Sequence, residues 1–109
     1  MSLYNTFYEC SSLTTINNLD KIKKITNLSN TFYNCTALTS LNLSGWDTSN
    51  VTNMNSMFRG CNSLNFIRCK QAFKNWCITN QDNIYLPTQM KEGTGIWDII
   101  DLDQDLNKD

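Results

Sequence analysis

The residues of this 109-residue chain that could do chemistry are five cysteines and a set of carboxylates. The chain contains no histidine, which excludes His-based catalytic triads, histidine general bases and mixed Cys/His zinc sites. No two cysteines form a C-x-x-C pair, which argues against a structural zinc site. Because no catalytic set can be assembled from the other residues, we expect a protein that is not an enzyme and that uses no metal or cofactor.

Three of the cysteines occupy one repeated position. Cys10, Cys35 and Cys61 each lie three residues after a phenylalanine. We interpret them as buried free thiols that fill a small apolar place in each repeat unit. We expect Cys69 to lie in the core as well. Cys77 follows it by eight residues and could form a disulfide with it only if the chain reverses between them, so the sequence leaves their redox state open.

The C-terminal carboxylates are similar to the start of a calcium-binding loop. Asp101, Asp103 and Asp105 alternate as the first ligands of such a loop do. The sixth position holds Leu106 in place of glycine, and the sequence ends before the twelfth position, where the loop needs glutamate. We therefore interpret residues 101–109 as a solvated acidic tail and predict no metal site there.

Three stretches of the chain share one phrase, Phe-x-x-Cys-x-x-Leu-x-x-Leu or Ile. The phrase begins at Phe7, Phe32 and Phe58, so its period is 25 and then 26 residues. A repeat of this length indicates a stack of similar units that share one continuous core. Such an architecture favours the display of a binding surface over catalysis.

The second unit shows the pattern most clearly. Leu38-x-x-Leu41-x-Leu43 has the apolar spacing of a leucine-rich-repeat strand, with one buried face and one polar face. Apolar residues at intervals of three and four from Val51 to Leu64 then predict one or two turns of helix on the same core. Each unit is therefore predicted to be a short strand, a turn and a short helix.

These patterns predict a leucine-rich-repeat-like α/β solenoid of about three rungs over residues 1–69. Residues 70–100 interrupt the repeat and contain an amphipathic helix at 71–78 and a last strand at 96–100. We interpret this segment as a helix-plus-strand C-terminal cap. It would cover the apolar face that the final rung otherwise exposes.

Charge and hydropathy exclude two classes of partner. The formal net charge of −1 at pH 7 provides no general attraction for nucleic acid. No run of about 18 apolar residues is present, so we expect no insertion into a membrane. The first residues of the sequence contain neither a basic segment nor an apolar run, so we predict no signal peptide.

One phrase, from Trp46 to Leu64, is highly specific. It contains Trp-Asp-Thr-Ser-Asn-Val-Thr-Asn-Met, then Met-Phe and Gly-Cys. It closely resembles the repeat of the BspA-like and mycoplasma-lipoprotein-type leucine-rich-repeat surface protein families. The resemblance covers residues 1–69 and implies a bacterial cell-surface or secreted protein that adheres to host proteins or other cells. Similar repeats occur in phage proteins, and this chain departs from the family in having about three units and no lipoprotein signal.

Two surfaces are candidates for binding. Outward residues of the predicted strands would lie side by side on one sheet face, which repeat proteins commonly use for recognition. These candidate ligand-binding residues are Thr15, Asn17, Ser40, Asn42, Phe66 and Arg68. No cap is predicted for the first rung, so Leu3, Tyr4 and Phe7 form a candidate assembly surface for a homo-oligomer or for upstream repeats.

Two functional hypotheses follow. The first is a non-enzymatic repeat module that binds a protein or a glycan, as an adhesin does at the cell surface. The second is a structural subunit of a phage virion or of a cell-envelope assembly. The open first rung favours the second hypothesis, whereas the predicted strand face favours the first.

Overall fold

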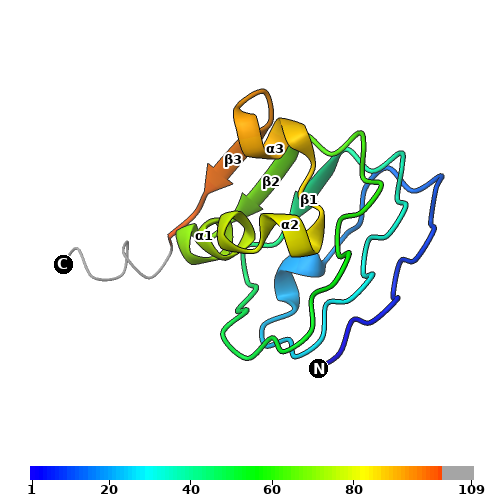
Figure 1. Cartoon of the computed structure of the whole chain (residues 1–109). Helices are drawn as coiled ribbons and strands as arrows, with labels where there is room; N and C mark the ends of the chain where they lie inside the picture. Colours follow the sequence, from blue (N-terminus) through cyan, green and yellow to red (C-terminus); the bar gives the residue numbers. More distant parts are fainter. Residues whose placement is uncertain (102–109) are drawn as a thin grey trace.

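The computed structural model of the protein describes residues 1–101, so all of the predicted acidic tail except Asp101 lies outside the described residues. Within them the chain forms a small α/β domain with three parallel strands in an open sheet and a few short helices (Figure 1). In chain order the elements are the 3-10 helix η1 (Leu19–Lys21), β1 (Ser40–Asn42), β2 (Phe66–Cys69), α1 (Gln71–Thr79), α2 (Gln81–Ile84), α3 (Thr88–Glu92) and β3 (Ile96–Ile99).

The sheet has the strand order β1-β2-β3, and all neighbouring strands are parallel. Its register places Ser40 beside Phe66 and Phe66 beside Ile96. Leu41 and Ile67 point to the other face and are buried, as the alternation of apolar and polar residues predicts. Parallel strands need long crossover connections. The remainder of a repeat unit connects β1 to β2, and the segment that contains α1, α2 and α3 connects β2 to β3.

Away from the sheet, three segments run in parallel and are hydrogen-bonded to one another: residues 2–9, 27–34 and 53–60. We call them the turn ladder. Amides of alternate residues in one segment donate to carbonyls of the next, as the Phe32 amide does to the Met57 carbonyl at 2.9 Å. The repeated sequence positions thus lie side by side.

The short helices predicted within the repeat units are wrong, because residues 51–64 form turns. The ladder amides donate to the next unit and not to carbonyls four residues back. Each ladder segment also holds two residues in the left-handed region, which interrupts an α-helix. These residues are Asn5 and Glu9, Asn30 and Asn34, and Ser56 and Gly60, with φ between 56° and 82°.

Phenylalanine rings stack through the centre of the molecule. The buried Phe32 ring lies between Phe7, at 5.8 Å and 1°, and Phe58, at 5.6 Å and 6°. Trp46 stacks against Phe32, and its indole N–H donates to the Leu19 carbonyl at 2.8 Å. This bond satisfies the polar atom of an otherwise buried aromatic side chain.

The C-terminal elements close the third unit on two sides. β3 pairs with β2 and continues the sheet. Across the ladder, the carbonyls of Asn83 and Ile84 accept the amides of Ser56 and Phe58, each at 2.9 Å. The last unit therefore has partners both at its strand and at its turn segment.

The helix predicted at 71–78 and the strand predicted at 96–100 are confirmed as α1 and β3. Asp101, which we interpreted as the first residue of a solvated tail, instead contacts the start of α1. Its carboxylate accepts a hydrogen bond from the Gln71 amide at 3.1 Å. A carboxylate is stabilising at this position because the amides at a helix N-terminus have no partner within the helix.

We expect Phe32→Ala to lower the free energy of unfolding by about 3–5 kcal/mol, since it removes the middle ring of the stack and leaves a cavity. Urea denaturation followed by circular dichroism measures this change. Ser63→Ala, at an exposed position of the third unit, is the control and should change the free energy by less than about 0.5 kcal/mol. Equal effects of the two variants would show that the ring stack does not hold the units together.

Candidate binding surface

The outer face of the sheet brings together four of the six predicted ligand-binding residues. Ser40 and Asn42 lie on β1, and the register pairs them with Phe66 and Arg68 on β2. Residues two apart in a strand project to the same side, so all four belong to one face. Asn42 and Arg68 are exposed, whereas Ser40 and Phe66 are partly buried.

Thr15 and Asn17, the other two predicted residues, are exposed but belong to no strand. Just before them, the Thr39 amide donates to the Thr14 carbonyl at 3.1 Å and joins the first unit to the second. Asn18 then adopts a left-handed conformation, with φ of 70°, directly before η1. The first unit therefore runs beside the sheet without adding a strand to it.

β3 contributes two residues to this face that the sequence reasoning missed. Ile96 is the register partner of Phe66, and 58% of its surface is exposed. Asp98 is the partner of Arg68, and its Oδ2 accepts a hydrogen bond from Arg68 Nε at 2.8 Å. The strand predicted at 96–100 was the available signal, but only the pairing of β3 with β2 places these residues here. An apolar pair thus lies beside an ion pair.

The ion pair contributes little to the stability of the fold. The Arg68 and Asp98 side chains are 46% and 33% exposed, so the pair contributes less than about 1 kcal/mol. It uses Nε of the guanidinium group, and the Arg68 side chain makes no other hydrogen bond or ion pair among residues 1–101. The remaining N–H donors of this planar group are available to a ligand.

The predicted assembly residues lie on the first ladder segment, which forms one edge of the molecule (Figure 1). Leu3 is buried in the core and Phe7 is partly buried, whereas Tyr4 is 55% exposed. Phe7 covers one face of Phe32, and no other ring in the described part of the chain contacts Phe7. The three residues therefore do lie together at an edge, with only Tyr4 largely exposed.

All five cysteines are free thiols, and Cys69 and Cys77 do not form a disulfide. The predicted burial is confirmed for Cys35, Cys61 and Cys69, while Cys10 is only partly buried because its unit is at the edge. Burial raises the pKa of Cys35 to about 11 and those of Cys61 and Cys69 to about 12. Burial also raises the pKa of Cys77. These four thiols therefore stay protonated and unreactive at neutral pH.

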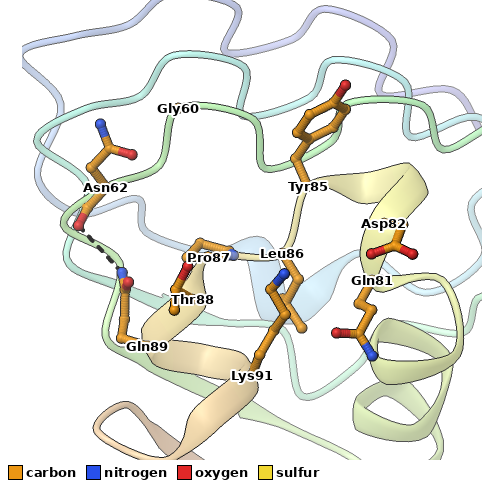
Figure 2. A pocket seen from close by; sticks show the side chains of 10 residues that line it. All are labelled: Gly60, Asn62, Gln81, Asp82, Tyr85, Leu86, Pro87, Thr88, Gln89 and Lys91. Carbon is orange, nitrogen blue, oxygen red and sulfur yellow. Dashed lines mark hydrogen bonds between the residues drawn. The ribbon is translucent and has the colours of Figure 1, made fainter.

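A polar hollow of about 500 Å³ lies between the third unit and the C-terminal helices (Figure 2). Figure 2 shows Asn62 and Gln89 on one side of it, and Asp82 and Lys91 among the residues that line the rest. The Gln89 side-chain amide is held by the Leu64 carbonyl at 2.6 Å. No motif marks the hollow, because its residues come from two separate parts of the chain. No group that could hold a metal ion occurs within residues 1–101.

A family model described as "Mycoplasma protein of unknown function, DUF285" matches residues 1–99. The chain belongs to the DUF285 family. The match includes α1, α2, α3 and β3, whereas the resemblance seen in the sequence covered residues 1–69. The C-terminal elements of this DUF285 domain are thus part of the family's unit.

No curated protein and no solved structure matches the DUF285 chain. Among residues 1–101, none of the helices is long and apolar enough to cross a membrane.

Alkylation should distinguish Cys10 from the buried thiols. We expect the native DUF285 chain to gain one iodoacetamide adduct, at Cys10, and the denatured chain to gain five, as mass spectrometry would count them. Cys10→Ser is the control and should abolish labelling of the native chain. Rapid native labelling of Cys61 would contradict the burial that the structure assigns to it.

Proposed function

We propose that this DUF285 protein is a short leucine-rich-repeat solenoid of the BspA-like type, which binds a protein or glycan ligand and performs no catalysis. It acts at the cell surface or in secreted form, as a module of adhesion. The period of 25 and 26 residues supports the proposal, since it recurs in the turn ladder. The parallel pairing of β1 with β2 supports it too, because leucine-rich repeats contribute one strand per unit.

The observation that carries the proposal is the apolar pair of Phe66 and Ile96 beside the ion pair of Arg68 and Asp98. Ile96 is exposed and Phe66 is partly buried. Interfaces combine an apolar centre with a polar rim, and aromatic and arginine side chains are enriched at their hot spots. Within the two ligand classes, a protein fits this face better than a glycan does, because it can bury the apolar pair.

The size of the face limits the strength of binding. β3 widens it to three strands, whose outer members lie about 10 Å apart. A stable interface needs about 800 Å² on each partner, so the ligand of a single domain is expected to bind transiently. Several domains acting together would raise the avidity without new contacts.

A structural subunit of a phage virion or a cell-envelope assembly is the second candidate function. The first ladder segment favours it, because Leu3, Tyr4 and Phe7 lie at an edge of the fold. In that role this edge would be covered within the assembly, and the sheet face would not need a ligand.

The double substitution Phe66→Ala/Arg68→Ala tests the sheet face. We propose to screen a panel of immobilised extracellular-matrix proteins and a glycan array with the wild-type chain, and to measure the affinity for each captured ligand by surface plasmon resonance. The variant should bind at least about tenfold more weakly, because it loses two hot-spot side chains.

The matched control is Asn62→Ala/Asp82→Ala, which alters the polar hollow and leaves the sheet face intact. It should bind as the wild type does and keep the wild-type urea midpoint. The sheet variant should unfold cooperatively at a somewhat lower urea concentration, because it loses the ion pair and part of the buried surface of Phe66. Loss of binding in the hollow variant alone would move the ligand site to the hollow. Wild-type binding by the sheet variant would show that the assignment of the face is wrong.

A further inference from the structure

The first ladder segment presents a row of backbone acceptors without donors. Within the ladder, the first and second segments donate amides to the segment that follows, and the second and third segments accept amides from the segment that precedes. In the second segment the accepting carbonyls, with bonds of 2.7–3.1 Å, are those of Asn27, Ser29, Thr31 and Tyr33. The equivalent carbonyls of the first segment, which accept no hydrogen bond from residues 1–101, are those of Ser2, Tyr4, Thr6 and Tyr8.

The Cys10 thiol in the first unit lacks the carbonyl acceptor that the equivalent thiols of the other two units have. The Cys35 thiol donates to the Phe7 carbonyl at 3.1 Å, and the Cys61 thiol donates to the Phe32 carbonyl at 3.0 Å. Both carbonyls belong to the preceding unit. Cys10 occupies the same repeat position, but no carbonyl among the described residues accepts its thiol hydrogen.

The aromatic rings of the first segment are covered on one side only. Tyr8 stacks on Tyr33 with centroids 4.8 Å apart, and Phe7 stacks on Phe32 at 5.8 Å. Phe32 is covered on both faces, because Phe58 stacks on its other side. Within residues 1–101, Phe7 and Tyr8 have no second ring partner.

A second copy of this chain does not supply the missing donors. Two first segments facing each other would place carbonyls against carbonyls. The two central donors at the outer edge of the third segment are already used in its own chain, where Asn83 and Ile84 accept the amides of Ser56 and Phe58. The occupant must therefore bring a free row of amides at alternate residues.

We propose that the first ladder segment docks a further repeat unit of the same type. That unit donates backbone amides to the four open carbonyls, offers a carbonyl to the Cys10 thiol and lays its rings on Phe7 and Tyr8. The contact between the first and second segments is the template for this interface, in which main-chain bonds and side-chain packing act together. Units add at this edge only, because the C-terminal elements close the other end.

A chain extended by a second copy of residues 26–51, placed directly before Met1, tests the proposal. The register suits this junction, because the Thr26 amide donates to the Met1 carbonyl and the Thr52 amide to the Thr26 carbonyl. The copied Cys35 is changed to serine so that labelling reports on Cys10. We expect the alkylation rate of Cys10 to fall at least about tenfold and the urea midpoint to rise.

The control extension contains the same residues in scrambled order. With it, the alkylation rate of Cys10 and the urea midpoint should equal those of the parent chain. Equal values for the ordered and scrambled extensions would overturn the proposal. If the extended chain does not fold, the peptide 26–51 added in excess should slow alkylation of Cys10 in the parent chain. If the peptide slows alkylation of Cys10 no more than its scrambled form does, the proposal is wrong.

Light scattering on the parent chain supplies a further test, for which the proposal predicts a monomer. A dimer in which Cys10 is protected would overturn it, because a second copy would then fill the face. The proposal relies on the proposed repeat architecture and not on the ligand of the sheet face. A failed binding screen with Phe66→Ala/Arg68→Ala therefore leaves the Cys10 measurement unaffected, and the two failures can be distinguished.

Discussion

Backbone hydrogen bonds between successive units hold this fold together. The ladder amides donate to the next unit, so a single unit has only tight turns to satisfy its own backbone. The same register stacks Phe32 between Phe7 and Phe58, which ties the backbone ladder to the core. Because one register governs both, it also aligns β1 with β2 and so builds the outer face of the sheet.

The C-terminal elements make the two ends of the molecule different. At one end, β3 and the carbonyls of Asn83 and Ile84 satisfy the last unit. At the other end, the first ladder segment keeps its acceptors open among the described residues. β3 also brings Asp98 against Arg68, so the element that ends the sheet completes the candidate binding face.

Much of the core could be predicted from local spacing. The phrase that begins at Phe32 identified its buried phenylalanine, cysteine and leucines, and the interrupted repeat identified α1 and β3. The apolar spacing of three and four residues led to the incorrect prediction of short helices in the repeat units. Tight turns with left-handed residues bury the same positions as a helix does. Gly60 has φ of 82° within such a turn, a conformation that glycine adopts without strain.

The period, the apolar positions and the residue types on the outer face follow from the order of residues along the chain and could be predicted from it. The tertiary structure alone decided that the segment with Thr15 adds no strand, that Ile96 and Asp98 join the face, and that one edge keeps open carbonyls. The physical reason is common to all three. Each depends on which backbone group a distant segment presents, and no local pattern of side chains encodes that pairing.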